Sequence, residues 1–442
     1  MGAPVSTGTR DTDVLVVGGG PAGATAAALL ARRGRRVTLI EKDHHPRFHI
    51  GESLLPANLP LFERLGVAGE VRAIGMPKGG AEFVAAHDGR RQDFRFSEAW
   101  DKSMPLAYHV RRSELDAILI RNAARAGAEV LEGARACAVD LGTPDGPAEV
   151  QVQHEDGGMV SWRARFVIDA SGRDTFLANH LHAKRRNPRH NSAAIFGHFG
   201  DARRHAGERE GYISIYWFEH GWLWFIPLGD GATSIGAVVW PYYLKRRTGT
   251  LSEFLLQTIA LCPPLAERLE GARLIREAEA AGNYSYHCTH THGRNYLLLG
   301  DAFAFIDPVF STGVLLAMQS AFAGVQAIEA CLDEPARARA ALREFDRLSR
   351  LGPRQYAWFI YRATSPTLRE MFLGPTNRLR MQEALLSLMA GDIFGSTPIW
   401  RALRAFKLAY GTLSLLHPRR SAHARRRHRL NIRAESGTMP AR

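Results

Sequence analysis

The chain has few cysteines and no long apolar run. Its four cysteines, at positions 137, 262, 288 and 331 of 442 residues, have no framework spacing, which excludes a disulfide scaffold and favours a reducing compartment. The apolar run over residues 314–328 is too short to span a bilayer and contains Gln319. The first residues lack the basic-then-apolar pattern of a signal peptide. We therefore expect a cytoplasmic protein without membrane association.

Lysine is also rare, although the chain is basic. Lys and Arg total 57 against 44 Asp and Glu, a formal net charge of +13, and only six of the 57 are lysines. Seven arginines and no acid fall within residues 419–433, so much of the excess charge lies in one segment. At 45% hydrophobic and 23% charged residues, the composition is that of a globular protein and excludes a wholly disordered chain.

A glycine-rich turn near the amino terminus joins a strand to a helix. An apolar strand over residues 13–17 precedes Gly18, Gly20 and Gly23, an alanine- and leucine-rich helix follows over 24–33, and Glu41 ends a second strand over 37–40. The three glycines permit the tight turn, the approach of backbone to a pyrophosphate, and close helix packing. With strand, helix, second strand and acid in register, the pattern predicts dinucleotide binding.

Segments typical of a dinucleotide-binding domain occur again later in the chain, and a segment with a different residue pattern lies between them. We expect a helix over 112–126, strands over 129–131, 148–154, 166–168 and 296–299, and a helix over 313–330, whereas alternating aromatic and aliphatic residues over 212–239 predict antiparallel strands. The predicted fold is α/β: a discontinuous Rossmann-type domain (10–75, 106–180, 285–340), an inserted antiparallel β-sheet substrate domain (76–105, 181–284), a helical C-terminal region (341–417) and a basic flexible tail (418–442).

The first unit alone leaves FAD and NAD open. Residues 108–116, 169–172 and 300–301 resemble the downstream flavin motifs of the para-hydroxybenzoate hydroxylase-like flavoproteins, a resemblance that implies FAD. It also implies that Arg112 contacts the nucleotide part of FAD and that Asp301 holds its ribityl or pyrophosphate region. Further FAD-contacting residues are expected alongside the glycines and Glu41: Ala22, Lys42, Glu52, Ser53 and Gly313.

Three further features resemble the flavin-dependent halogenases. Residues 222–227 read Trp-x-Trp-x-Ile-Pro, residues 305–313 read Phe-x-x-Pro-x-x-Ser-x-Gly, and Lys78 follows Pro77 at the family's active-site lysine position. The resemblance implies that a separate NAD(P)H-dependent flavin reductase supplies FADH2, that O2 forms a flavin hydroperoxide, and that chloride or bromide is then oxidised to hypohalous acid, which Lys78 holds near the substrate.

Roles for the two motifs follow from the same resemblance. Ser311, Thr312 and Gly313 open a helix and would bind the halide through backbone N–H groups. Taken alone, Ser311 or Thr312 would be an ordinary helix cap, but beside the tryptophan motif the anion site is favoured. Trp222 and Trp224, stiffened by Ile226 and Pro227, would form a wall between flavin and substrate. Alternating tryptophans on a strand are also usual in protein cores, and both interpretations can hold.

One departure narrows the expected substrate. Halogenases acting on free tryptophan carry a glutamate immediately before the Ser-Thr-Gly segment, and this chain has Phe310. The resemblance then favours the branch acting on phenols or pyrroles, free or tethered to an acidic carrier protein. Asp307 could attach flavin covalently, as in some relatives, but an Asp-Pro turn is favoured.

Alternatives remain at this stage. The protein could be an aromatic hydroxylase or a related flavin oxidoreductase, or, in a different class, a nucleic-acid-binding flavoprotein that uses its basic tail. That tail has no interleaved aromatic residues, which favours a solvated or carrier-docking end over nucleic acid. The cluster of Cys288 with His287, His290 and His292 lacks a fourth ligand on one strand face, so we expect no metal.

Overall fold

The computed structural model describes residues 8–143, 146–282 and 285–433. Its first layer is a sheet with the order β7-β2-β1-β10-β9-β8, in which β19 also pairs with β10. The parallel strands are β1 (Thr9–Val17), β2 (Val37–Ile40), β7 (Glu129–Leu131), β10 (Met159–Asp169) and β19 (Tyr296–Leu298). The antiparallel edge is formed by β8 (Ala134–Asp140) and β9 (Ala148–His154).

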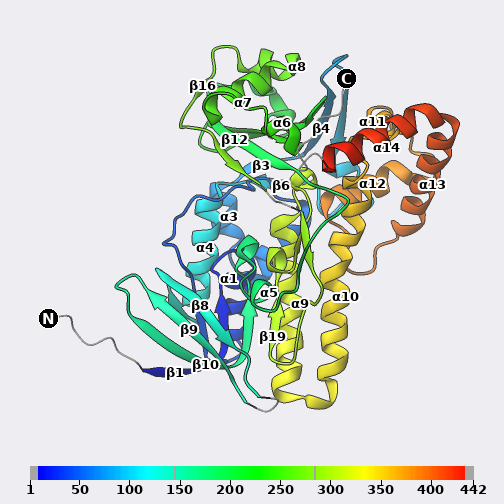
Figure 1. The fold of residues 1–442 in the computed structure, drawn as a ribbon. Helices are drawn as coiled ribbons and strands as arrows, with labels where there is room; N and C mark the ends of the chain where they lie inside the picture. The colour runs from blue at the N-terminus through cyan, green and yellow to red at the C-terminus, as the bar shows by residue number, and fades with distance from the viewer. Residues whose placement is uncertain (1–7, 144–145, 283–284, 434–442) are drawn as a thin grey trace.

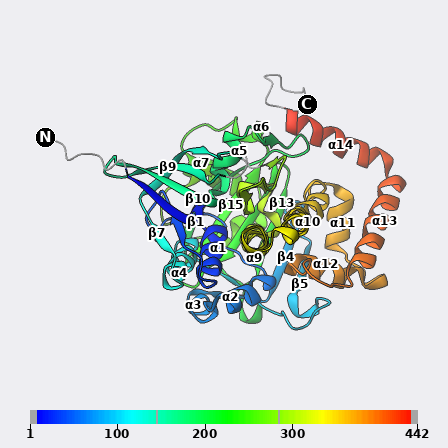
Figure 2. The same cartoon turned by 90° about the horizontal axis from the view of Figure 1, so that it is seen from below.

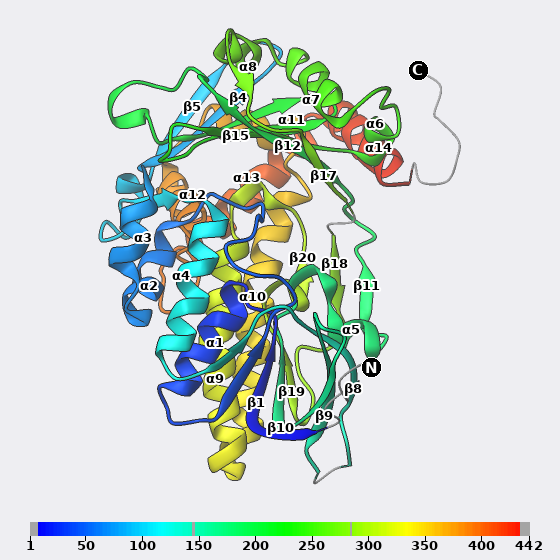
Figure 3. The same cartoon turned by 90° about the vertical axis from the view of Figure 1, so that its left-hand side faces the viewer.

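Three helices cover one face of this sheet: α1 (Pro21–Ala31), α4 (Arg112–Arg125) and α9 (Gly313–Asp333). Figure 3 shows them stacked beside β1 and β10. Helix α1 begins at Pro21, whose missing N–H costs nothing in the first turn, and it is apolar on all sides because it is buried between the sheet and both neighbouring helices. The predicted α/β dinucleotide-type domain is thus confirmed.

A second sheet lies above the first in Figure 1, with the order β16-β12-β15-β14-β13-β4-β5 and with β17 on β12. Its pairs are antiparallel except for β4 beside β13, which run parallel. The bounds are β4 (Gly80–Ala85), β5 (Arg91–Arg95), β12 (Ala193–Gly200), β13 (Ile213–Phe218), β14 (Gly221–Pro227), β15 (Thr233–Val239), β16 (Arg273–Leu274) and β17 (Glu279–Ala281).

Both faces of the second sheet are covered, so its central strands are buried along their whole length. One face packs against α7 (Leu251–Ala260), and the other packs against the carboxyl-terminal helices. Short elements complete the fold: α2 (Leu59–Leu65), α3 (Ala68–Ile74), α5 (Phe176–His180), α6 (Pro241–Leu244), α8 (Pro263–Ala266), β3 (Met76–Lys78) paired with β6 (Ala107–His109), and β11 (Lys184–Arg186), β18 (Tyr286–Cys288) and β20 (Ala304–Phe305).

The carboxyl-terminal region is helical, as predicted: α10 (Pro335–Ile360), α11 (Pro366–Leu373), α12 (Met381–Ala390), α13 (Trp400–Leu416) and α14 (Pro418–Arg433). Figure 2 shows α11 to α14 gathered on one side of the molecule, with α13 and α14 outermost. The expectation of a flexible end from residue 418 is wrong as far as residue 433, because α14 is a helix that packs on α11 and α13. Residues 434–442 lie outside the described residues.

One helix among the described residues, α9, is long and apolar enough to cross a membrane. However, 67% of its apolar window is buried inside the protein. It packs between α1 and α10. Like α1, it is apolar because it is largely buried in the core.

Candidate active site

A cavity of about 1030 Å³ lies between the two sheets. Most of the residues predicted to serve the cofactor, the halide and the tryptophan wall line it together: Gly18, Gly20, Ala22, Glu41, Lys42, Glu52, Ser53, Arg112, Trp222, Trp224, Ile226, Asp301, Ser311, Thr312 and Gly313. Three predicted residues do not line it: Gly23, Lys78 and Pro227. Segments far apart in the sequence therefore meet at one site.

The glycine-rich turn has the shape required to hold a pyrophosphate. A Cβ at Gly18 would lie 2.3 Å from the Ala170 carbonyl oxygen, and one at Gly23 would lie 1.9 Å from the Gly18 oxygen, so these two positions serve close packing. At Gly20 the nearest atom to such a Cβ is 3.9 Å away. Gly20 therefore borders open space at the amino terminus of α1, where N–H groups and the helix dipole favour phosphate.

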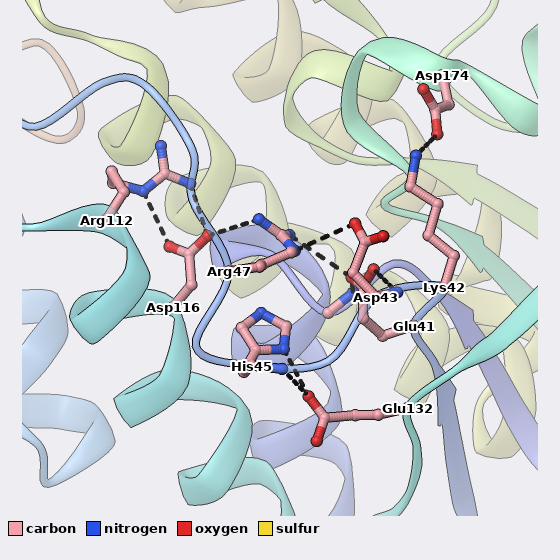
Figure 4. A network of polar contacts seen from close by, with 10 residues as sticks. Glu41, Lys42, Asp43, His45, Arg47, Arg112, Asp116, Glu132 and Asp174 are labelled. Atoms are coloured by element: carbon pink, nitrogen blue, oxygen red, sulfur yellow. Dashed lines mark hydrogen bonds and ion pairs between the residues drawn. The ribbon is translucent and has the colours of Figure 1, made fainter. Parts of the chain in front are cut away.

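Glu41 closes the same end of the cavity. Its Oε2 accepts a 2.7 Å hydrogen bond from the Gly19 N–H, and its Oε1 accepts one from the Asp43 N–H at 3.0 Å. Lys42 pairs with Asp174 (Figure 4). The carboxylate of Glu41 thus holds the glycine-rich turn in place by hydrogen bonding. Both the carboxylate and the turn are fixed where a nucleotide would lie.

Arg47 was missed by the sequence analysis. Its guanidinium lies 3.6 Å from Glu41, 3.7 Å from Asp43 and 3.5 Å from Asp116, and it lines the cavity (Figure 4). It follows β2 in an irregular loop, where no periodicity or motif marks it. This partly buried cation links three carboxylates beside the glycine-rich turn, and its N–H groups border the space where a phosphate-bearing cofactor would lie.

Arg112 and Asp301 approach the cavity from the other two flavin motifs. Arg112, at the first turn of α4, donates two 2.9 Å hydrogen bonds to Asp116, so its guanidinium is held rigidly. Burial raises the pKa of the Asp301 carboxyl to about 6, although Arg112 and Arg173 lower it. Together with the turn at Gly20, these residues fit the pyrophosphate and ribityl parts of FAD.

The predicted halide loop lies where η7 (Pro308–Phe310) ends and α9 begins. Ser311 has φ +56°, a left-handed conformation that non-glycine residues rarely adopt. The Thr312 side chain makes no capping hydrogen bond, and a Cβ at Gly313 would meet nothing within 4 Å. The first amides of α9 therefore border open space in the cavity instead of being capped, which is suited to a small anion.

Asp307 caps η7 and stays outside the cavity lining. Its Oδ1 accepts a 3.1 Å hydrogen bond from the Val309 N–H, and its Oδ2 lies 2.8 Å from the His190 Nε2. The carboxylate thus serves the Asp-Pro turn that the sequence analysis favoured.

The two tryptophans lie side by side on β14. Their ring centroids are 5.9 Å apart, and the Trp224 Nε1 donates a 3.2 Å hydrogen bond to the Ser234 Oγ. Both rings line the cavity and both belong to the apolar cluster beneath the carboxyl-terminal helices. They are therefore core residues that also form the boundary of the cavity.

Lys78 is buried, with a side chain 2% exposed. Its Nζ donates 2.9 Å hydrogen bonds to the Ser53 Oγ and the Leu54 carbonyl, and lies 5.3 Å from the centre of the Phe96 ring. Burial lowers its pKa to about 7. Since Ser53 lines the cavity and Lys78 does not, the amine stands one hydrogen bond behind the cavity wall.

A histidine missed by the sequence analysis lies behind this lysine. His109 is fully buried on β6, which pairs with β3, and its Nε2 donates a 2.9 Å hydrogen bond to the Gly211 carbonyl. Burial and the nearby Lys78 hold the pKa of His109 well below its usual value. Its neutral ring adds no second positive charge beside the amine.

Glu52 and Phe310 complete the surroundings. Glu52 lines the cavity, and its carboxylate lies 2.9 Å from the Nε2 of His198, a buried residue of β12 that no motif marked. Phe310 packs with Tyr356 at 5.8 Å and Phe359 at 6.1 Å between ring centroids. Phe310 is therefore part of an aromatic cluster.

The cluster around Cys288 does not form a metal site in the part of the chain that the structure describes. Strand β18 ends at Cys288, so the strand alternation expected to align the later histidines does not continue. Among the described residues, no group of three or more His, Cys, Asp or Glu side chains could hold a metal ion.

Comparisons with known proteins agree with this geometry. An FAD binding domain family model matches residues 11–345. The chain is 29% identical to a 1H-pyrrole-2-carbonyl-[peptidyl-carrier protein] chlorinase of Pseudomonas fluorescens, over 87% of this chain and 90% of the relative. It is 34% identical to a tryptophan 2-halogenase of Chondromyces crocatus, over 73% and 62%.

Among solved structures, the myxobacterial chondrochloren halogenase CndH superposes with a TM-score of 0.76 at 31% identity, covering 89% of this chain and 93% of that one. The expected FAD-binding fold and the resemblance read from the motifs are thereby confirmed. The chain belongs to the flavin-dependent halogenases.

Proposed function

We propose that this protein attaches chloride or bromide to an electron-rich aromatic ring, a phenol or a pyrrole, through Lys78. The observation that carries the proposal is a buried amine, with a pKa of about 7, that is hydrogen-bonded to a residue lining the FAD cavity. Reduced FAD with O2, when bound, supplies the oxidant that converts halide to hypohalous acid.

The chain's own residues divide the remaining tasks. The uncapped amides at the start of α9 hold the halide, and Trp222 and Trp224 keep the organic ring away from the flavin. Lys78 as the ammonium can donate a hydrogen bond to hypohalous acid. As the neutral amine it attacks the halogen: an N–halogen bond forms while the oxygen–halogen bond breaks, and water leaves. The ring then takes the halogen, loses a proton and returns the free amine.

A pKa near 7 keeps both forms of Lys78 populated at neutral pH, whereas an exposed lysine would be almost entirely protonated. An arginine could not replace it because its guanidinium stays charged. This requirement explains why a lysine stands here in a chain with only six lysines among 57 basic residues.

Phe310 supports the choice of substrate. Phe310 cannot accept the ring proton as a carboxylate could, which favours a ring already activated by its own hydroxyl or nitrogen. The relative from Pseudomonas fluorescens is named for a pyrrole tethered to a carrier protein, which supports a pyrrole, free or carrier-bound. The sequence contains one glycine-rich dinucleotide motif, which favours a separate NAD(P)H-dependent flavin reductase.

The test is halide dependence of the product mass. Enzyme with reduced FAD, O2 and phenol or pyrrole is expected to give a product heavier by one halogen in place of one hydrogen with chloride or bromide, and no new product without halide. A hydroxylated product that forms independently of halide would instead identify an aromatic hydroxylase and overturn the proposal.

A further inference from the structure

A second cavity, of about 820 Å³, lies where α13 and α14 meet the end of α10. Four arginines line it: Arg189, Arg362, Arg425 and Arg429. Among its described lining residues there is no Asp or Glu, and none of the four arginines forms an ion pair with a described carboxylate. A cavity with several cations and no counter-charge of its own is suited to an anionic ligand.

Arg362 lies deepest among these cations. Its Nη1 donates a 2.9 Å hydrogen bond to the Trp358 carbonyl, and its guanidinium lies 4.4 Å from the centre of the Trp358 ring and 5.6 Å from that of Tyr410. The aromatic rings fix the guanidinium plane while leaving its charge without a carboxylate partner. Hydroxyls of Tyr361, Ser365 and Tyr410 in the same lining can donate to phosphate oxygens.

The inner wall of this cavity is connected to the candidate halide loop. The His428 Nε2 of α14 donates a 3.0 Å hydrogen bond to the Arg189 carbonyl. The next residue, His190, contacts Asp307 at 2.8 Å, and Asp307 caps η7 immediately before Ser311. An anchored group in the arginine-lined cavity would therefore lie next to the segment that leads into the reaction site.

The outer surface beside the cavity combines exposed leucines with cations. Leu408, Leu415 and Leu416 of α13 are 73%, 80% and 67% exposed. Arg419 and Arg420, in the first turn of α14, follow after His417 and Pro418 and are exposed. Figure 2 shows both helices at the outer edge, away from the FAD-binding sheet. Apolar anchors rimmed by one sign of charge are typical of a surface that docks a protein of the opposite sign.

We propose that this surface, the α13–α14 face with its arginine-lined cavity, docks an acidic carrier domain that bears the aromatic ring on a phosphodiester-linked arm. In this arrangement the cavity binds the phosphate, the exposed arginines of α14 pair with the carrier's carboxylates, and the leucines pack against apolar side chains of the carrier. This proposal rests on the proposed function for the identity of the ring. Nucleic acid fits less well, because leucines accompany the exposed arginines on the outer surface, and the Trp358 and Tyr410 rings inside are already in contact with Arg362.

The test measures binding separately from catalysis. The probe is a peptidyl carrier domain, either bare or carrying phosphopantetheine loaded with pyrrole-2-carboxylate, titrated at low salt by fluorescence anisotropy. The variant is R425E/R429E on α14. The matched control is R339E/R343E on α10, which makes the same charge change at the same spacing on exposed residues outside the cavity.

We expect R425E/R429E to weaken binding of the loaded carrier roughly ten-fold or more, and the control to bind as the unchanged protein does. R362Q is expected to abolish the preference for the loaded over the bare carrier, because it removes the least exposed of the cations proposed to hold the phosphate. Equal binding by R425E/R429E and the unchanged protein, or tighter binding of a DNA duplex than of the carrier, would overturn the proposal. Failure of the proposed function would look different: the carrier would still bind, but no halogenated product would form.

Discussion

The buried amine of Lys78 makes the stability of the protein depend on pH in a defined way. Its pKa falls from 10.5 to about 7 on folding because burial disfavours the charged form. Below pH 7 the amine is protonated in both states, and the folded protein carries the full cost of a buried charge. Between pH 7 and 10.5 the unfolded chain holds the proton and the folded one does not, so stability rises with pH.

The magnitude follows from the size of the shift. A shift of one pKa unit corresponds to about 1.36 kcal/mol, so a shift of this size is worth at most about 5 kcal/mol. The variant Lys78→Met removes this titration while filling the same volume. The difference in unfolding free energy between the two proteins is therefore expected to change by about 4 kcal/mol between pH 6 and pH 10. The stability of Lys78→Met relative to the unchanged protein is expected to be greatest at pH 6.

The assay is urea unfolding of both proteins across that pH range, followed by tryptophan fluorescence. Groups away from Lys78 titrate in both proteins and cancel in the difference, and burial, the main cause of the low pKa of His109, acts on that ring in both proteins. A difference that stays constant from pH 6 to pH 10 would refute the reasoning, because it would mean that the amine keeps its ordinary pKa and is never neutral near pH 7.

Outcomes are also expected for four other variants. Gly20→Ala should fold normally but bind FAD about ten-fold more weakly in a fluorescence titration, because its Cβ would enter the space expected for the pyrophosphate. Gly18→Ala should instead lower the stability of the protein, because Gly18 has a φ of +106° and a Cβ there would lie 2.3 Å from a carbonyl oxygen. Trp222→Ala should cost about 3 kcal/mol in thermal unfolding and allow hydroxylated product in mass spectra. Phe310→Glu should lower the free energy of unfolding by about 3 kcal/mol or more without raising turnover, because the carboxylate would be buried among aromatic rings. A variant that is as stable as the unchanged protein and turns over faster would contradict this prediction.

Local patterns in the sequence predicted the flavin-binding frame well. The bounds of β2 are those predicted, and the glycine-rich turn and the helix from Arg112 lie where expected, whereas the strand predicted over 166–168 is the last part of the longer β10 (Met159–Asp169). Each of these features depends on neighbours within a few residues: glycines needed for close approach, an alanine-rich buried helix, and short apolar strands. Such patterns can be recognised in the sequence without knowledge of the tertiary structure.

Features set by long-range contacts were not predictable. Arg47 lies in an irregular loop and acquires its role only from carboxylates that follow β2 or lie on α4. His198 is one polar residue in a buried strand, and only the fold brings it to Glu52. The parallel pairing of β4 with β13 joins segments more than a hundred residues apart. Helix α14 was missed because its charge pattern resembles a solvated tail, and its packing on α11 and α13 stabilises it.

The most direct test of the account is one turnover by the Lys78→Ala variant. Reduced FAD, O2, bromide and pyrrole are mixed with the variant and with the unchanged protein, flavin oxidation is followed by absorbance, and the organic product is weighed by mass spectrometry. The account predicts equal flavin oxidation in both proteins and brominated pyrrole only from the unchanged one. Brominated pyrrole from the variant at the normal yield would contradict it.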